Sequence, residues 1–232
     1  MLILDSLSKH YGDKVALDGL NLDVPAGGIF CMLGHNGAGK TTTVNLLLNF
    51  IQPSAGTIEI NGRNLHADPA AVLRQVAYIP ELVMLYPELD ARENLDYFSR
   101  LAGKRYSRSE LAGHLQRAGL PPEAHAKAVG RYSKGMRQKV GIAIALAKQA
   151  ALLVLDEPTS GLDPQASWEF SQLLQDLAAQ GVTIFMVTHD LFRVRELRAQ
   201  VGILKLGKLQ RLLDSETLSH QELETLYLQV AH

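Results

Sequence analysis

The chain has 232 residues, with 23 Lys and Arg against 24 Asp and Glu, which gives a formal net charge of −1. This length can bury a substantial core in one or two domains, and the 47% hydrophobic and 20% charged residues exclude wholesale disorder. The balanced charge excludes the chain-wide basic field that holds nucleic acid through its phosphates, so we expect no nucleic-acid partner.

The sequence carries no sign of export or of membrane insertion. The single cysteine, Cys31, excludes an intramolecular disulfide and fits a reducing compartment. The apolar run 140–147 is cut by Lys148 and Gln149, and it is shorter than the roughly 20 residues that a membrane span needs. The first five residues lack the basic and apolar regions of a signal peptide. We therefore expect a cytoplasmic protein.

The first half of the chain predicts strands of two kinds. Apolar and polar residues alternate in 1–24 and in 57–60, which is typical of strands buried on one face. The continuous apolar run 28–33 predicts a strand buried on both faces. After that run, apolar residues at helical spacing predict a helix that reaches Ile51; they are Val44, Leu47, Leu48 and Ile51.

The middle of the chain, 89–149, is mostly helical in pattern, with breaks at Gly103, at 119–122 and at Gly130. Two further buried strands follow at 152–155 and 183–187.

The remaining patterns complete an α/β arrangement. Asp163-Pro164 predicts a helix start and Gly181 its end, while 203–210 predicts one strand that bends at Gly207. A small amphipathic helix at the end carries Leu223, Leu226, Tyr227 and Val230. Buried strands followed by helices favour a central sheet covered on both sides.

A glycine-rich loop follows the first buried strand and opens the predicted helix. It matches the pattern G-x-x-x-x-G-K-[ST], and its residues are Gly34, His35, Asn36, Gly37, Ala38, Gly39, Lys40, Thr41 and Thr42. The glycines let backbone amides face anionic oxygens, and the helix dipole favours a phosphate there. We expect Lys40 to reach the β- and γ-phosphates and Thr41 to ligate Mg²⁺. The alternative is a chance glycine turn.

Two acids end the second buried strand, at the sheet edge where α/β proteins bind ligands. We expect Asp156 to hold Mg²⁺ through water and Glu157 to polarise the water that attacks the γ-phosphate. An acidic pair that caps a helix is the alternative, although Pro158 follows and no helix is predicted before Asp163.

A basic segment, 131–139, opens a helix shortly before these acids. The helix dipole disfavours each exposed cation at this end by roughly 0.3–1 kcal/mol, so a polyphosphate explains the segment better than local stability does. The alternative is a solvated basic helix start. The phosphate loop by itself leaves kinases, GTPases, helicases and transport ATPases open.

Six motifs in order resemble those of the ATP-binding subunit of ABC transporters, over essentially the whole chain. They are Tyr11-Gly12 (the aromatic loop that stacks on adenine), Gly34–Thr42 (Walker A), Tyr132–Met136 (the LSGGQ signature), Leu152–Glu157 (Walker B), Ser160–Asp163 (the D-loop) and Thr188-His189 (the switch histidine).

The resemblance implies a P-loop NTPase of the ABC ATPase fold, with a RecA-like α/β core, an antiparallel β subdomain and a helical subdomain. We expect one domain over 1–232. Residues 1–84 and 150–232 form the core with its β subdomain, and residues 85–149 form the helical subdomain that carries the signature.

The family also implies a head-to-tail pair of nucleotide-binding domains that encloses two ATP molecules with Mg²⁺. We expect a homodimer, and a heterodimer is the alternative. The signature residues Ser133, Lys134, Gly135 and Met136 would face the γ-phosphate bound by the other subunit. His189 would orient the attacking water, and Asp163 would communicate between the two sites. ATP hydrolysis would drive a separate transmembrane permease, which places the subunit peripherally on the inner face of the cell membrane.

Three positions depart from the common family pattern. Lys134 replaces a glycine and Met136 a glutamine of the signature, and Glu81 occupies the position of the Q-loop glutamine. A carboxylate at that position can still ligate Mg²⁺; the alternative for Glu81 is an exposed loop acid.

The signature YSKGM together with Glu81 resembles the ATPases of ABC-2-type export systems. His35 is similar to the members that mature copper enzymes, such as the nitrous-oxide reductase accessory ATPase. The segment 82–95, with Tyr86, Arg92, Glu93 and Asn94, is expected to contact the coupling helix of the permease.

Two other functions stay open on the sequence. An ABC ATPase that acts on ribosomes or DNA is disfavoured, because no sustained heptad or basic patch lies between Lys40 and Ser133. The sequence does not distinguish transport from a mechanical or regulatory role without translocation.

Overall fold

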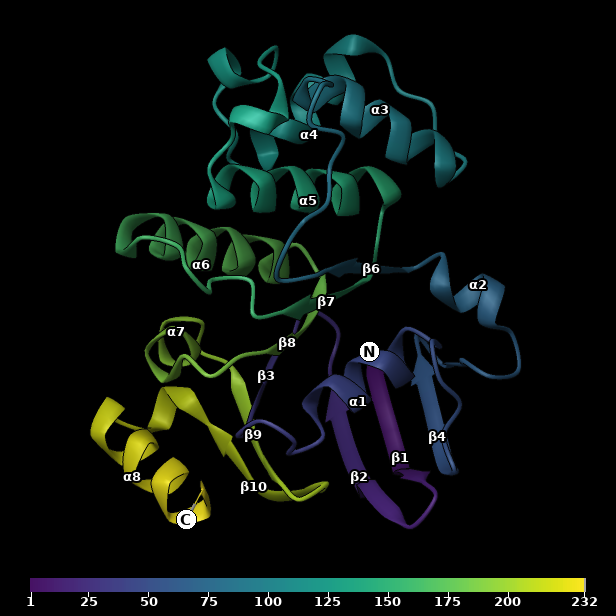
Figure 1. Cartoon of the computed structure of the whole chain (residues 1–232), viewed down its shortest axis with the longest axis vertical. Helices are drawn as coiled ribbons and strands as arrows, with labels where there is room; N and C mark the ends of the chain where they lie inside the picture. Colours follow the sequence, from purple (N-terminus) through teal and green to yellow (C-terminus); the bar gives the residue numbers. More distant parts are fainter. Residues whose placement is uncertain (232) are drawn as a thin grey trace.

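A six-stranded sheet forms the centre of the computed structural model, which describes residues 1–231 (Figure 1). Its strand order is β10-β9-β3-β8-β7-β6; only the β10–β9 pair is antiparallel. The strands are β3 (Ile29–Leu33), β6 (Val76–Ile79), β7 (Leu152–Asp156), β8 (Thr183–Val187), β9 (Gln200–Lys205) and β10 (Lys208–Asp214).

The three predicted buried strands, β3, β7 and β8, are confirmed and contribute to a separate core on each face of this sheet. In β3, Phe30 and Met32 face one core, while Cys31 and Leu33 face the other. The rings of Phe30 and Phe185, which are cross-strand partners, stack with their centroids 5.5 Å apart. Burial on both faces explains why these strands lack polar alternation.

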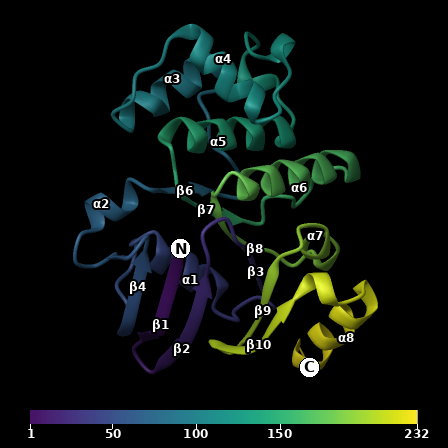
Figure 2. The same cartoon turned by 180° about the vertical axis from the view of Figure 1, so that it is seen from behind.

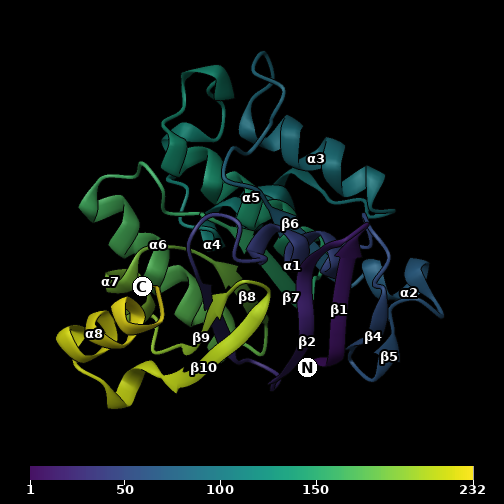
Figure 3. The same ribbon diagram turned by 60° about the horizontal axis from the view of Figure 1, so that its bottom comes forward.

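One core is closed by a second sheet, which is antiparallel with the order β2-β1-β4-β5. Its strands are β1 (Leu2–Tyr11), β2 (Lys14–Val24), β4 (Ala55–Ile60) and β5 (Arg63–Asn64). Helix α1 (Lys40–Leu47) lies between the two sheets (Figure 3), and the short α2 (Pro69–Leu73) follows β5. The core packing of α1 anchors the end of the glycine-rich loop.

Helices cover the other face of the six-stranded sheet. Helices α3 (Ala91–Leu101), α4 (Arg108–Arg117) and α5 (Lys134–Lys148) lie together at one end of the molecule (Figure 1). Viewed from behind, α6 (Pro164–Ala179) lies between α5 and α7 (Leu191–Glu196), as Figure 2 shows. Single 3-10 turns occur at Pro122–Ala124, Val129–Arg131 and Ser215–Thr217.

The terminal helix α8 (His220–Ala231) is amphipathic as predicted and packs Leu223, Tyr227 and Val230 on the core. The predicted boundaries of the helical subdomain, 85 and 149, enclose α3–α5 and stay a prediction. Within residues 1–231, no helix combines the length and the apolar character that a membrane crossing requires.

Two predicted elements are wrong in extent. Helix α1 ends at Leu47 rather than reaching Ile51, because Asn49 takes the left-handed conformation (φ 55°) that commonly ends helices. The predicted bent strand 203–210 is a hairpin of β9 and β10. Its two turn residues, Leu206 and Gly207, both have positive φ (50° and 79°), as a tight hairpin turn requires.

The segment before α3 is fastened to it by the Asn94 side chain, which is fully buried. Its amide oxygen accepts from the Tyr86 backbone N–H at 2.8 Å, and its amide nitrogen donates to the carbonyls of Tyr86 (3.1 Å) and Asp90 (3.0 Å). The expectation that Asn94 contacts a partner is therefore wrong. Glu93 receives the Asp90 backbone N–H in a capping box but is exposed, so its expected contact with a partner stays a prediction.

Replacing Asn94 with Ala is expected to lower the free energy of unfolding by about 1–3 kcal/mol, because a fully buried amide and its part-buried hydrogen bonds to the Tyr86 backbone are lost. Chemical denaturation measures the change. Arg100→Ala on the exposed side of α3 is the control, with an expected change below about 0.5 kcal/mol. Equal stability of Asn94→Ala and the wild type would contradict the account.

Candidate nucleotide site

Four neighbouring parallel strands end at one edge of the central sheet. In the order β3-β8-β7-β6, their carboxyl ends lead to the glycine-rich loop, to His189, to Asp156 with Glu157, and to Glu81. Parallel strands place the residues that follow them on the same side. The sheet thus brings together candidate residues that are far apart in the sequence.

The glycine-rich loop is closely surrounded by other backbone segments. A Cβ atom at Gly34 would lie 2.6 Å from the Leu204 carbonyl oxygen, and one at Gly39, where φ is 117°, would lie 2.7 Å from that of Ala16. Only glycine fits both positions. Ala38 is buried, and its carbonyl accepts a hydrogen bond from the Gly207 backbone N–H at 2.9 Å. The hairpin of β9 and β10 therefore braces the loop.

Lys40 folds back over this loop. Its Nζ donates to the Gly34 carbonyl at 2.6 Å and to that of His35 at 3.2 Å. Burial lowers the pKa of Lys40, and the negative charges of Glu157 and Asp156 partly oppose this effect. A half-buried amine close to two carboxylates can transfer its hydrogen bonds from carbonyls to phosphate oxygens.

The other loop residues differ in their exposure. Asn36 and Gly37 are exposed at the loop tip, and the His35 ring nitrogen Nδ1 lies 2.7 Å from the Asn36 carbonyl oxygen. At the start of α1, Thr41 is exposed and Thr42 is partly exposed. The hydroxyl of Thr43, which the sequence did not single out, is buried and donates to the Gly39 carbonyl at 3.1 Å.

Glu157 and His189 are in direct contact. His189 Nδ1 lies 2.8 Å from Glu157 Oε1, and the His189 backbone N–H donates to Oε2 at 3.4 Å. Glu157 has a positive φ of 46°, and its N–H donates to the Val187 carbonyl at 2.9 Å. The Glu157 side chain is 18% exposed, whereas that of His189 is 68% exposed. The histidine therefore fixes the orientation of a carboxylate that solvent reaches only in part.

Asp156 is half-buried beside other negative charges. Burial raises its pKa most, and the charges of Glu157 and Glu81 raise it further, while the Tyr78 hydroxyl opposes the rise. Tyr78, on β6, is a neighbour that the sequence reasoning missed; its position two residues before Pro80 carries no distinctive signal. The raised pKa indicates a carboxylate that a cation would stabilise.

The donor set around Asp156 fits Mg²⁺ as the nucleotide's companion ion. Among the described residues, no group of three or more His, Cys, Asp and Glu side chains is arranged to hold a metal by itself. Mg²⁺ is commonly held by one or two carboxylates with phosphates and water, and the oxygens of Asp156 and Thr41 are of that kind.

Glu81 is not an isolated loop acid. Its Oε1 accepts a hydrogen bond from Ser160 Oγ at 3.0 Å and lies 3.4 Å from Lys134 Nζ. These two donors hold the pKa of Glu81 below its usual value. The carboxylate thus joins the segment after β6 to the D-loop and to the start of α5.

The signature segment begins α5. Ser133 is the N-cap, and its exposed hydroxyl accepts from the Met136 backbone N–H at 3.3 Å. Gly135 is buried, and Met136 packs partly on the core. The first turn holds no acidic residue, so the positive end of a 15-residue helix lies open beside an exposed serine.

The basic residues of this segment are engaged within the chain. Lys139 forms an ion pair with Glu169 on α6 at 2.9 Å, and Arg137 donates to the carbonyls of Val129 (3.5 Å) and Gly130 (3.3 Å). The expectation that a polyphosphate explains the basic segment is therefore wrong for Arg137 and Lys139. Their partners on neighbouring elements account for their presence near a helix start.

Asp163 lies at the start of α6, and Tyr11 lies at the end of β1. Asp163 caps α6 by accepting from the Ala166 N–H at 2.9 Å. Tyr11 ends β1, with its side chain 48% exposed and the Lys9 amine 5.1 Å from its ring centroid. The same hairpin places Ala16 against Gly39, so an exposed aromatic ring lies on the element that borders the phosphate loop.

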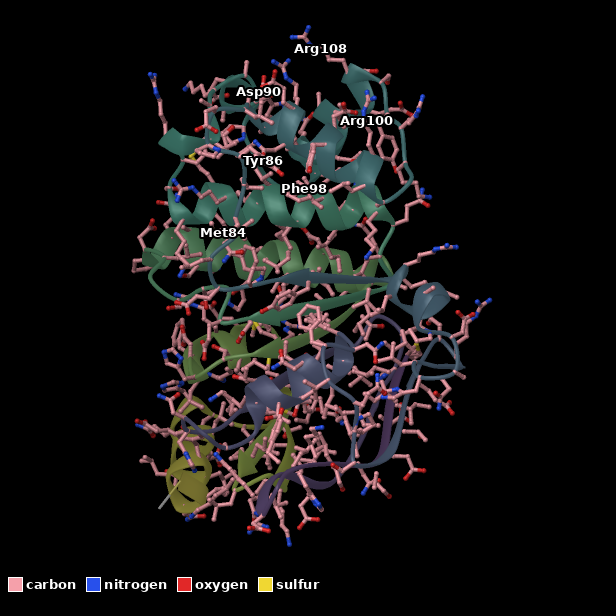
Figure 4. All side chains as sticks on the ribbon, turned by 45° about the vertical axis from the view of Figure 1, so that its right-hand side comes forward. Met84, Tyr86, Asp90, Phe98, Arg100 and Arg108 are labelled. Atoms are coloured by element: carbon pink, nitrogen blue, oxygen red, sulfur yellow. The ribbon has the colours of Figure 1, made fainter. Side chains whose placement is uncertain are left out.

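A groove of about 740 Å³ lies between β6, α2, α3 and α5, and Tyr78 is part of its wall. Apolar side chains form much of its wall, including Phe98, Leu101 and Ile144. Cations line it at Arg74, Lys104 and Lys148. Figure 4 shows Phe98 and Tyr86 on the α3 side of α5; their ring centroids are 6.3 Å apart.

Comparison with known proteins agrees with this geometry. The ABC transporter family matches residues 17–160. The chain is 39% identical to the bacitracin transport ATP-binding protein BcrA of Bacillus licheniformis, over 97% of this chain and 73% of the relative. It is 33% identical to the lantibiotic transport ATP-binding protein SrtF of Streptococcus pyogenes, over 98% of this chain and 96% of the relative.

Solved structures give the same result. An ATP-binding subunit of an ABC transporter superposes with a TM-score of 0.85 at 30% identity and covers 100% of both chains. The cassette MJ0796, in a dimeric post-hydrolysis state bound to ADP and Pi, matches with a TM-score of 0.80 at 26% identity, over 93% of this chain and 99% of its own.

The predicted family, fold class and ATPase activity are thereby confirmed, and so is the resemblance to exporter ATPases. This family shares the fold that carries the phosphate loop, the Glu157–His189 pair and the capped signature helix. The chain belongs to the ABC transporter family, as an ATP-binding subunit that hydrolyses ATP.

Proposed function

We propose that two copies of this chain enclose two ATP molecules, each held between the glycine-rich loop of one copy and Ser133 of the other. The observation that carries this proposal is the start of α5, where the exposed Ser133 caps a helix whose first turn holds no acidic residue. A terminal phosphate from a second subunit supplies the missing charge. The dimeric cassette MJ0796 supports this arrangement.

Within each site the residues act as follows. The loop amides and Lys40 bind the phosphates, and Tyr11 stacks on the base. Glu157, oriented by His189, accepts a proton from the attacking water. Thr41, Asp156 and Glu81 hold Mg²⁺, which neutralises charge on the phosphates when bound. Asp163 stands at the start of α6, from which it contacts the opposite site.

The groove between α3 and α5 is the proposed contact with a transmembrane permease. A helix with an apolar stripe and acidic ends matches its apolar walls and the cations at Arg74 and Lys104. The proposed contact therefore lies nearer the end of α3 than the segment 82–95, where the sequence predicts it. Docking there places the subunit on the inner face of the membrane.

Export is the direction of transport that the relatives support. One is named for Nod factor export in Burkholderia orbicola and another for daunorubicin resistance in Streptomyces coeruleorubidus. The similarity of His35 to copper-enzyme-maturation members stays a prediction.

Replacing Glu157 with Gln is expected to retain ATP binding, to slow hydrolysis by about 100-fold or more, and to accumulate a dimer in ATP, because a neutral amide cannot accept the proton. Size-exclusion chromatography with light scattering measures the dimer, and phosphate release measures the rate.

Glu216→Gln, at an exposed acid away from the site, is the matched control and should behave as the wild type. Adding Lys40→Ala to Glu157→Gln should abolish the dimer. Wild-type turnover in Glu157→Gln, or a monomer at saturating ATP, would contradict the proposal.

Replacing Leu101 with Arg is expected to reduce recovery of the subunit with membranes by at least about tenfold, since a buried unpaired charge disrupts an apolar contact. ATP affinity should not change. Leu101 is 68% exposed, so the variant should fold normally. Leu228→Arg on α8 is the control, because this leucine is also exposed (46%) but lies outside the groove. Equal membrane recovery of both variants would exclude the groove as the contact with the permease.

A further inference from the structure

Lys134 and Glu81, two positions where this chain departs from the common family pattern, are in contact with each other. Lys134 Nζ lies 3.4 Å from Glu81 Oε1, and Ser160 Oγ donates to the same oxygen at 3.0 Å. The Lys134 side chain is 25% exposed and that of Glu81 is 51% exposed. A positive charge at the signature thus faces a negative charge at the proposed metal site.

One face of α5 follows the segment that contains Glu81. Lys134, Gln138 and Gly141 recur at i, i+4 and i+7, so they lie on one side of the helix. The buried Gln138 amide donates to the Glu81 backbone carbonyl at 3.1 Å and to that of Pro80 at 3.4 Å. Gly141 lies opposite Ile79 and Val83, so a Cβ there would be 3.4–3.5 Å from their side chains.

These contacts fix the backbone at Glu81 whether or not the ion pair forms. Gln138 and Gly141 hold the backbone of the segment, while Ser160 and Lys134 together set where the Glu81 carboxylate points. The charge of Glu81 raises the pKa of Asp156, which places the two carboxylates within electrostatic reach. Lys134 and a cation beside Asp156 would therefore compete for the Glu81 carboxylate.

We propose that Lys134 is a positioning residue that withholds Glu81 from Mg²⁺ in the single subunit and releases it when the signature meets the partner's nucleotide. The inference rests on the proposed dimer. Phosphate oxygens of the opposite ATP then replace Glu81 as the counter-ion of Lys134. Each site binds its metal fully only after the other site holds ATP, which links the two nucleotides through one ion pair in each subunit.

The test measures the Mg²⁺ requirement of ADP binding by the single subunit. A fluorescent ADP analogue reports affinity, and the measured quantity is the Mg²⁺ concentration at half of the Mg²⁺-dependent rise. Lys134→Gln is expected to lower this concentration by about threefold, since exposed ion pairs shift equilibria by roughly two- to fivefold.

Three further variants separate the ion pair from other effects. Lys134→Arg keeps the charge and should match the wild type. Lys139→Gln removes another ion pair of the same helix, the one with Glu169, and should also match it. In a Glu81→Gln background, Lys134→Gln should change the Mg²⁺ requirement by less than about 1.5-fold, because the lysine acts through that carboxylate.

An unchanged or higher Mg²⁺ requirement in Lys134→Gln would overturn the inference. The same threefold change in the Glu81→Gln background would overturn it too, since the lysine would then act on Mg²⁺ directly through space. ADP binding by a monomer does not depend on dimer formation. Failure of the Glu157→Gln dimer would therefore refute the proposed function without altering the coupling measured between these two charges.

Discussion

The parallel alignment of β3, β8, β7 and β6 is the constraint on which the site depends. Each strand delivers one component to the same edge: the phosphate loop, the histidine, the acidic pair and Glu81. The strands hold this alignment because they are buried on both faces, between the second sheet with α1 on one side and the helices on the other. Loss of either core would misplace every component together.

The charges at this edge are arranged for a ligand that is both anionic and accompanied by a cation. Lys40 turns toward loop carbonyls, while Asp156 carries a raised pKa beside two other carboxylates. Glu157 is held by His189, and Glu81 by Lys134 and Ser160. Lys40, Glu157 and Glu81 thus each have a partner within the free subunit. On the proposed function, ATP with Mg²⁺ would exchange the internal partners of Lys40 and Glu81 for phosphates and metal, which would also change how α5 and the D-loop are held.

Local patterns predicted the buried strands and the phosphate loop well, because apolar runs and glycine positions follow directly from burial and backbone geometry. The predicted extent of α1 was wrong because the signal of Asn49, a residue type that often takes the left-handed conformation at helix ends, was not used. The β9–β10 hairpin was missed because Leu206 takes a left-handed conformation that leucine rarely adopts. The Lys134–Glu81 contact could not be predicted, because it joins residues 53 positions apart through the packing of α5 on the segment after β6. For the same reason, the partners of Arg137 and Lys139 became visible only in the fold.

The central claim is that two subunits together form each ATP-binding site. One subunit contributes the glycine-rich loop, and the other contributes Ser133. The most direct measurement is a crystal structure of the chain with a non-hydrolysable ATP analogue and Mg²⁺. The account predicts that the terminal phosphate accepts a hydrogen bond from Ser133 Oγ of the partner subunit, at an ordinary distance of about 2.7–3.0 Å. A nucleotide bound by the loop with residue 133 of every neighbouring copy far from its phosphates would contradict the account.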